Sequence, residues 1–471
     1  MNLARPSSLS LDTEPQAPPT VTPLTESSAE AYVASTCFKI GPPGRVGVEL
    51  EWFVHDSCRP HTAPDPARVR AALDALHLPP DHPFLPNGSR VTQEPGGQVE
   101  LSSPAAADLP GCVETTHQDL AALRAAFAAQ GLDLAGYGTE PHPKERRVTL
   151  RQPRYLAMEE FFGRTGPWGK IMMCATASTQ VCLDAGTDTA GPDGFRTRWR
   201  LAHLLGPVLV AAFANSPLLD GRPTGYRSTR QAVWARMDPS RTLAPGGVHG
   251  CGPDGDPCAA WARYVLDAAV LCVRRPEGRP WNAPVGLTFR AWLRRPEAER
   301  PSLADLDYHL STLFPPVRPR GYLELRMIDA QPGDGWVVPA ALTSALFAGP
   351  RSVDAALAAL EPLAAGASGT AEPGPRGPAW SRAATRGMDD PVLRQAALDC
   401  FAAADTVLAD RPGEGRLRSA LGEFAERYTA RGRCPADDLL DGAAPPRTGA
   451  GRSADSPPSG NSPKSEEDAP C

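Results

Sequence analysis

The sequence predicts an α+β fold in which a mainly antiparallel sheet carries helices on one face. Short segments of alternating apolar and polar residues are interleaved with longer Ala-, Leu- and Arg-rich segments of helical periodicity. The strand-like segments are spaced too irregularly for repeated strand–helix–strand units, which disfavours a parallel sheet. Hydrophobic residues make up 41% of the 471 residues, so the chain can bury a sizeable core.

Residue periodicity predicts where each element lies. Alternation with a period of two predicts strands over residues 45–54, 98–102, 132–138, 179–184, 285–292 and 321–328. Apolar residues recurring every three or four positions predict helices over residues 66–76, 109–130, 195–214, 257–273, 338–348, 353–363, 391–409 and 415–428. Residues 225–242 are predicted to run from a loop into a helix.

Composition divides the chain into one domain and two tails. Residues 1–30 are rich in Pro, Ser and Thr, and residues 441–471 are rich in Pro, Ser and Gly. Neither segment can bury enough apolar surface to offset the entropy lost on ordering, so both are predicted to be disordered. Residues 31–440 are predicted to form a single domain, with a Gly-, Ala- and Pro-rich surface loop at residues 364–378.

Charge and apolar patterning exclude several classes of protein. Asp and Glu (54) outnumber Lys and Arg (48), and the net charge of -6 argues against nucleic-acid binding. The longest apolar run, residues 204–214, is too short to span a bilayer, and residues 1–30 lack the apolar segment of a secretory signal. The eleven cysteines are scattered and never spaced as C-x-x-C, which indicates reduced thiols. A cytoplasmic protein without membrane or nucleic-acid partners is therefore expected.

One predicted strand, residues 45–54, has an acidic face. Side chains two apart point to the same side of a strand, so Glu49 and Glu51 lie together with Gly47 while the apolar residues share the other side. Two adjacent carboxylates repel each other unless a cation lies between them. A solvated outer face of a sheet is the alternative interpretation of a single such strand.

The same pattern recurs in three further predicted strands. Their polar faces carry Glu100 with Gln98 and Ser102, Gln180 with Cys182 and Asp184, and Glu324 with Arg326. Glu94 lies in the Gly-rich segment just before residue 98. Hard divalent cations such as Mg²⁺ prefer carboxylate oxygens together with nucleotide phosphates. An Arg on the same face as a metal-binding Glu, as Arg326 is, can contact the phosphate that the metal holds.

A cluster of arginines occurs in residues 225–242. Arg227, Arg230, Arg236 and Arg241 lie among aromatic and hydroxyl residues, and the guanidinium group binds a carboxylate or phosphate with two hydrogen bonds. In so Arg-rich a chain, any one of them can equally be a surface charge. Residues 163–172 depart from the phosphate-binding P-loop, and no nucleophile motif occurs. Phosphate would therefore be held by metal and Arg.

Five segments together resemble a known family: VGVELEWFV, LPNGSRVTQEPGGQVELSS, MMCATASTQVCLD, YRSTRQAVWARMDPSRT and YLELRMIDAQPGDGW. They are similar to the carboxylate–amine ligases that include plant and bacterial glutamate–cysteine ligases, especially the actinobacterial type that makes γ-glutamylcysteine for ergothioneine synthesis. The resemblance implies a glutamine-synthetase-like fold, whose curved sheet forms an active-site cup with helices outside it. Residues 31–440 would then be one catalytic ligase domain.

The resemblance also implies roles for individual residues. It implies metal ligands at Glu49, Glu51, Glu94, Glu100, Gln180 and Glu324. Arg230 would bind the glutamate carboxylate, and Arg326 would face the ATP phosphates. Beyond the resemblance, Arg227 and Arg241 of the same arginine cluster are predicted to bind substrate, and Arg326 and Glu324 are predicted to act in catalysis. Cys182 departs from the family pattern, in which a hard ligand is frequent, because Mg²⁺ has little affinity for sulfur.

The activity implied is the ATP-dependent joining of L-glutamate to L-cysteine through a γ-glutamyl phosphate, with Mg²⁺ as cofactor. Three alternatives remain open: a related ligase that uses another amine, a guanidino-phosphotransferase, and a non-catalytic nucleotide or metal sensor of the same fold. The sensor is disfavoured because carboxylates persist on several strands. Oligomeric state has no signal in the sequence.

Overall fold

One antiparallel sheet organises the chain. The computed structural model describes residues 24–41, 44–76, 84–245, 256–296, 299–365 and 374–443. Seven strands form the sheet: six pair in the order β2–β3–β1–β5–β9–β8, and β4 pairs with the end of β1. Their bounds are β1 Val46–Asp56, β2 Arg90–Gln93, β3 Val99–Ser102, β4 Leu132–Ala135, β5 Ser178–Asp184, β8 Val317–Pro319 and β9 Tyr322–Asp329. A separate short hairpin joins β6 Leu218–Leu219 to β7 Arg222–Pro223.

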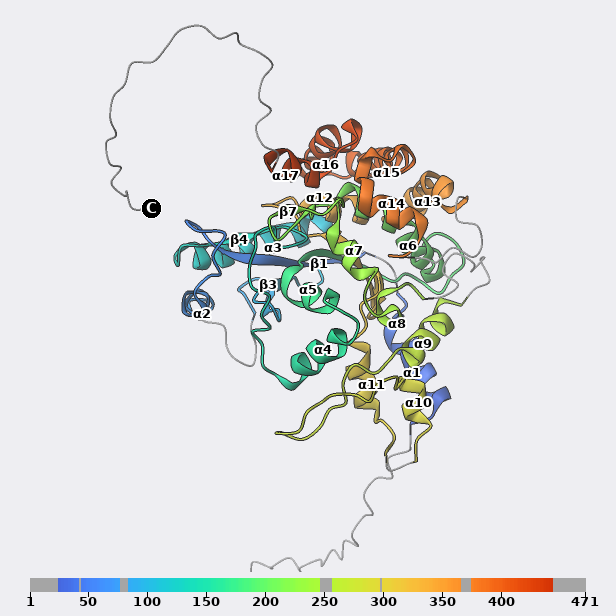
Figure 1. Cartoon of the computed structure of the whole chain (residues 1–471). Coiled ribbons are helices and arrows are strands. Elements are labelled where there is room, and N and C mark those ends of the chain that lie inside the picture. Colours follow the sequence, from blue (N-terminus) through green and yellow to red (C-terminus); the bar gives the residue numbers. More distant parts are fainter. Residues whose placement is uncertain are drawn as a thin grey trace, which may run out of the picture.

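The apolar face of the sheet is covered by helices. The apolar side chains of β1, β3, β5 and β9 all belong to the main core. Helix α3 (Leu109–Ala128) packs on β1 and β4, α6 (Phe195–Ala212) packs on β9, and α12 (Val337–Leu346) packs on β5. Outside them lie α13 Pro350–Ala365, α14 Pro378–Arg386, α15 Pro391–Ala409, α16 Gly415–Arg427 and α17 Pro435–Ala443 (Figure 1). The predicted α+β class with an antiparallel sheet is confirmed.

A second, smaller core lies at the polar side of the sheet. It is formed by α4 (Pro153–Gly163), α5 (Trp168–Ala175) and α7 (Thr229–Trp234). Gln98, at the start of β3, donates hydrogen bonds to the carbonyl oxygens of Met173 and Thr176 at the end of α5. These helices therefore border the acidic face. The remaining helices are α2 Pro66–Asp74, α8 Pro239–Thr242, α9 Pro257–Asp267, α10 Phe289–Leu293 and α11 Leu303–Leu310.

The predicted strand at residues 285–292 is wrong. Thr288 lies at the N-terminal cap of α10, where its hydroxyl accepts a hydrogen bond from the backbone N–H of Ala291. Capping of this kind satisfies an otherwise unpaired donor, so the end of the segment becomes helical. The short strands β2 and β8 were not predicted, because runs of four and three residues carry little periodicity.

The predicted N-terminal tail is also partly wrong. Helix α1 (Glu26–Cys37) begins inside residues 1–30, and Thr25 and Ser28 form a reciprocal capping box at its start. Ala29 and Val33 are fully buried, and α1 packs along α9. At the other end, α17 continues to Ala443. Residues 1–23 and 444–471, on which the rest of the predicted disorder falls, lie outside the described residues, as do residues 366–373 of the predicted surface loop.

Among the residues that the structure describes, no helix has both the length and the apolar character needed to cross a membrane.

Candidate active site

Strand register brings the predicted acidic residues together. Glu51 on β1 lies opposite Glu100 on β3, and Glu49 lies opposite Gln180 on β5. Continuing across the sheet, Cys182 on β5 lies opposite Glu324 on β9. Since residues opposite each other in a sheet share a face, these side chains form one polar surface across four strands.

Glu94 joins this surface from the turn between β2 and β3. Its backbone N–H donates to the Gln98 carbonyl oxygen at 2.8 Å, and the Gly97 N–H donates to the Glu94 carbonyl oxygen at 2.9 Å. The turn packs so closely on α5 that a Cβ at Gly96 would lie 2.4 Å from the Cα of Cys174. Only glycine fits there, and the close packing holds Glu94 beside the sheet.

The clustered carboxylates resist ionisation. Burial, together with Glu324 and Glu100, raises the pKa of Glu49 to about 8. Burial also raises the pKa of Glu94, with contributions from Glu100 and Glu51, and the pKa of Glu100, with a contribution from Glu51. These carboxylates therefore cannot all ionise with the compensation that the surrounding protein supplies, and a bound cation would stabilise their charged forms.

Glu324 has the opposite environment. Its carboxylate accepts hydrogen bonds from Arg318 Nε at 3.0 Å and Nη2 at 2.8 Å, and it also contacts Arg326. Burial opposes its ionisation, but Arg318, Arg326 and Arg320 outweigh burial and lower its pKa. Arg318 was missed by sequence reasoning, because its strand β8 is only three residues long. The sequence signal available was the short VRPRGY segment before β9.

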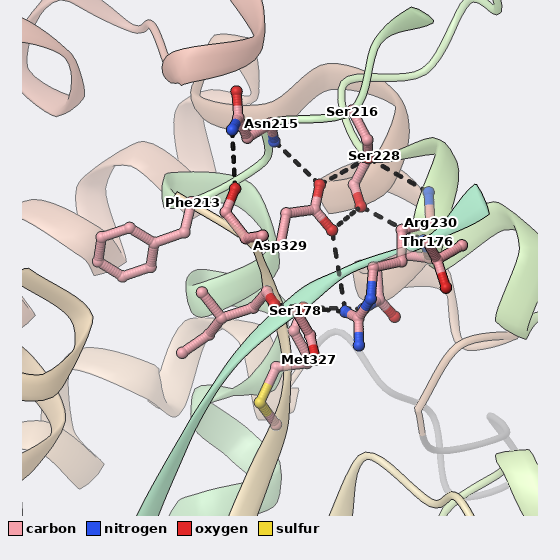
Figure 2. Close-up of polar contacts among 12 residues, drawn as sticks. Thr176, Ser178, Phe213, Asn215, Ser216, Ser228, Arg230, Met327 and Asp329 are labelled. Atoms are coloured by element: carbon pink, nitrogen blue, oxygen red, sulfur yellow. Dashed lines mark hydrogen bonds and ion pairs between the residues drawn. The ribbon is translucent and has the colours of Figure 1, made fainter. Parts of the chain in front are cut away.

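Two guanidinium groups lie within the polar surface. Arg326 Nη1 donates to the Gln180 side-chain oxygen at 2.6 Å. Arg230 Nη2, from the first turn of α7, donates to the backbone carbonyl oxygen of Arg326 at 2.8 Å. Both guanidinium groups retain a buried Nε–H that has no hydrogen-bond partner. Figure 2 shows the Arg230 guanidinium pointing toward Asp329.

The donor chemistry of this surface fits Mg²⁺. Five carboxylates and one amide oxygen face the same side, and hard oxygen donors are those that Mg²⁺ prefers. Within the described ranges, no three His, Cys, Asp or Glu side chains are already arranged around a common metal position. Several oxygens are engaged with protein donors, as Glu51 is with Ser178 and Gln180. Such a surface suits an ion that keeps waters and nucleotide phosphates among its ligands.

Comparison with known proteins identifies the family. The sequence profile of glutamate-cysteine ligase family 2 matches residues 45–456. The chain belongs to this family. It is 40% identical over 423 residues to the glutamate–cysteine ligase EgtA of Mycolicibacterium smegmatis, covering 88% of this chain and 90% of that one.

Two further relatives and one solved structure are also similar to this chain. The EgtA ligase of Mycobacterium tuberculosis is 39% identical over 430 residues, covering 89% of this chain and 90% of the relative. The chloroplastic glutamate–cysteine ligase of Medicago truncatula is 30% identical over 327 residues, which is 66% of this chain and 62% of the relative. A solved glutamate–cysteine ligase from Francisella tularensis in complex with AMP aligns over 86% of each chain, with a TM-score of 0.49 and 12% identity. The predicted membership of a glutamate–cysteine ligase family is confirmed.

The structure does not bring two of the predicted substrate residues to the polar surface. Arg241 is fully buried, and its guanidinium donates to Asp238 at 2.9 Å, to the Thr312 carbonyl oxygen at 2.9 Å and to the carbonyl oxygen of Ala269. The predicted substrate contact of Arg241 is therefore replaced by a structural role in which it ties α8 to the segments around it.

Arg227 also lies outside the polar surface. Its Nε forms an ion pair with Asp437 of α17 at 2.7 Å. The sequence shows that Arg227 and Arg230 are close along the chain, but only the fold shows that they face different neighbours. The two residues were grouped as substrate ligands because they are close in the sequence, but in the fold their side chains contact different elements.

A cavity opens beside the acidic surface of this family member. It has a volume of about 600 Å³ and is lined by Thr92 and Glu94 of the β2 region and by Leu150, Gln152 and Tyr155 before and within α4. Glu94 therefore belongs to the cluster of carboxylates and also lines the cavity. Access from this cavity to the sheet would bring a small molecule next to the carboxylates.

Proposed function

We propose that this chain joins the γ-carboxylate of L-glutamate to the amine of L-cysteine, consuming ATP and producing γ-glutamylcysteine, ADP and phosphate. One observation carries the proposal: five carboxylates and two buried guanidinium groups converge on one face of the sheet in a member of this ligase family. The resemblance to EgtA ligases extends the proposal to ergothioneine biosynthesis in the cytoplasm.

Six residues are proposed to hold Mg²⁺ on this surface: Glu49, Glu51, Glu94, Glu100, Gln180 and Glu324. When bound, the ion would neutralise charge on the phosphates and on the phosphoryl group in transfer. The raised pKa values of Glu49, Glu94 and Glu100 support this assignment, because buried like charges need a cation to ionise together. Cys182 is proposed to lie beside the ligands without binding the ion.

The two arginines are proposed to bind the reacting groups. Arg326 would contact the ATP phosphates as a catalytic residue, and its unpartnered Nε–H offers a hydrogen bond for that purpose. Arg230 would bind a carboxylate of the substrate glutamate. A buried donor without a partner costs free energy, and a bound anion would satisfy it.

The proposed reaction has two steps. A γ-carboxylate oxygen of glutamate attacks the γ-phosphorus of ATP, and the bond from that phosphorus to the ADP oxygen breaks, which leaves a γ-glutamyl phosphate. The cysteine amine then attacks the acyl carbon, the C–O bond to phosphate breaks, and the amine gives up a proton. The residues here position these groups and stabilise charge, so no protein nucleophile is required.

The test is mass spectrometry of the products formed from ATP, Mg²⁺ and glutamate with a panel of amines. With cysteine, we expect γ-glutamylcysteine and ADP in equal amounts, and a higher kcat/KM than with any other amine. A higher kcat/KM for another amine would identify a ligase of different specificity. ATP binding without ADP release, for any amine, would contradict a catalytic role altogether.

A further inference from the structure

A buried carboxylate outside the proposed ligand set lies at the end of β9. Asp329 is 2% exposed and accepts hydrogen bonds from the backbone N–H of Asn215 at 2.9 Å, from Ser216 Oγ at 2.6 Å and from Ser228 Oγ at 3.0 Å. Its Oδ1 also lies 3.8 Å from Arg230 Nη1 (Figure 2). Three hydrogen-bond donors and one guanidinium group thus surround this buried carboxylate, and they compensate its removal from water.

The donors around Asp329 also hold the helix that carries Arg230. Ser216 Oγ donates to Asp329 and accepts from the Arg230 backbone N–H at 3.2 Å. Ser228 Oγ donates to Asp329 and accepts from the Gln231 N–H at 3.3 Å, as the N-terminal cap of α7. Asp329 therefore fixes both the backbone and the guanidinium of Arg230.

The neighbouring backbone is shaped to admit this carboxylate. A Cβ at Gly138 would lie 2.4 Å from Asp329 Cγ and 2.6 Å from Oδ2. Since real Cβ atoms do not approach so closely, the Asp329 side chain fills the space that any residue but glycine would need at position 138. Its position has little freedom.

The contacts of the Arg230 guanidinium leave one of its nitrogens available for a ligand. Its two terminal nitrogens donate to the β9 carbonyl oxygens of Arg326, at 2.8 Å, and Ile328, at 3.4 Å. Trp234 packs against the guanidinium at 4.7 Å from the ring centroid. The remaining donor, Nε, is buried without a partner. Rotation of the guanidinium would move that donor away from the site, and Asp329 opposes such rotation.

We infer that Asp329 is a positioning residue for glutamate binding, which holds Arg230 in the orientation that receives the substrate carboxylate. The inference rests on the proposed function of Arg230. Asp329 touches no substrate in this scheme; it acts through Arg230 and the first turn of α7.

The test compares Asp329→Asn, Arg230→Lys and the double variant in steady-state kinetics, with KM measured separately for glutamate and ATP. Asp329→Asn is expected to raise the glutamate KM about tenfold and the ATP KM less than about threefold, since its effect passes through one bound carboxylate. The double variant should have the glutamate KM of Arg230→Lys alone, because residues acting through one contact are not additive. Equal increases in both KM values, or additive effects in the double variant, would overturn the inference.

Asp56→Asn is the matched control. Asp56 is likewise a buried aspartate at the end of a strand, 6% exposed, and it pairs with Arg68 at 2.5 Å, away from the acidic surface. It should change the melting temperature without changing the glutamate KM. A glutamate KM raised as much by Asp56→Asn as by Asp329→Asn would mean that general loosening explains both, and the inference would fail.

Two gentler variants apply if Asp329→Asn does not fold. Ser216→Ala and Ser228→Ala each remove one hydrogen-bond donor to Asp329 and leave the carboxylate itself in place. Both should raise the glutamate KM selectively, and an unchanged glutamate KM in both would overturn the inference. If Arg230→Lys itself leaves the glutamate KM unchanged, the proposed role of Arg230 fails. If only Arg230→Lys raises it, the role of Asp329 fails.

Discussion

At the scale of the residue, carboxylates on the same surface differ because their neighbours differ. Glu324 is fully buried between guanidinium groups, which keep it ionised. For Glu49 of β1, burial and then the carboxylates of Glu324 and Glu100 raise the pKa to about 8. The negative charge of Glu324 is thus already compensated by protein side chains, whereas that of Glu49 is compensated only when a cation is bound.

Replacing Glu324 tests the proposed ligand set. Glu324→Gln keeps the size of the side chain and its hydrogen bond from Arg318 but removes the charge. Turnover is expected to fall at least about a hundredfold, on the order of 3 kcal/mol in the barrier. Glu414→Gln is the control, because Glu414 is also buried, 4% exposed, and pairs with Arg411 at 3.5 Å. Near-normal turnover of a folded Glu324→Gln would place the metal elsewhere.

Cys182 places a sulfur beside the proposed Mg²⁺ ligands. It lies between Gly47 of β1 and Glu324 of β9, and burial with two neighbouring carboxylates keeps its pKa well above the ordinary value. It is therefore a thiol, and a thiol is a poor ligand for Mg²⁺.

Two substitutions separate the roles of Cys182. Cys182→Ala is expected to lower turnover less than tenfold, since no bond to the ion is lost. Cys182→Asn adds a hard oxygen beside Glu324 and is expected to keep or raise turnover with Mg²⁺. A crippled Ala variant would make the sulfur a participant. Harm from Asn alone would show a packing role instead.

At the scale of the element, capping residues determined where two helices begin, which the periodicity of apolar residues alone did not predict. Helix α1 has weak amphipathic character, yet Thr25 caps it and Ala29 and Val33 bury its inner side. Helix α10 replaced a predicted strand because of the Thr288 cap. In contrast, α15 has the predicted bounds, since nineteen residues contain enough turns for the 3.6-residue period to be read from the sequence.

Truncation tests the role of α1. Removing residues 1–30 deletes the capping box, the buried Ala29 and the ion pairs that Glu26 and Glu30 make with Arg290 at 2.7 and 3.2 Å. The loss is roughly 2–4 kcal/mol, equivalent to about 2–4 °C in the melting temperature of a chain this long. Removing residues 1–23 keeps every described contact and serves as the control. Equal melting temperatures for the two truncations would contradict a stabilising α1.

At the scale of the whole molecule, strand order assembles the site from distant segments. The segments that carry Glu49 and Glu324 are the first and the last of the five family-like segments, and β5 between them places both residues on one surface. The layers behind the sheet, from α3 to α16, form one continuous core. A loss of stability in that core would therefore also disturb the strands that carry the active-site residues.

A buried histidine makes this stability depend on pH. His309 of α11 donates from Nε2 to the Val265 carbonyl oxygen of α9 at 2.9 Å, and burial lowers its pKa to about 3. The unfolded chain takes up a proton near the ordinary pKa of about 6.5, whereas the folded chain does not until about pH 3. Stability is thus full above pH 6.5 and falls as the pH decreases, by about 2 kcal/mol at pH 5.

His309→Gln retains a donor but does not titrate. The melting temperature of the unmodified chain should drop between pH 7.5 and pH 5.0 by about 2 °C more than that of His309→Gln. His117→Gln is the control, because the His117 side chain is 38% exposed. Parallel melting curves for the unmodified chain and His309→Gln would show that His309 is protonated in the fold.

The sequence by itself determined which residues of each strand share the polar face and which share the apolar face, because side chains alternate between the two faces along consecutive residues. It also carried the five segments by which the family is recognised. Three partnerships were decided by the tertiary structure alone. Arg241 forms internal hydrogen bonds, Arg318 donates hydrogen bonds to Glu324, and Asp329 forms an ion pair with Arg230. The physical reason is that a side chain's partners depend on strand register and helix packing between segments far apart in the chain, and neither leaves a local periodic signal.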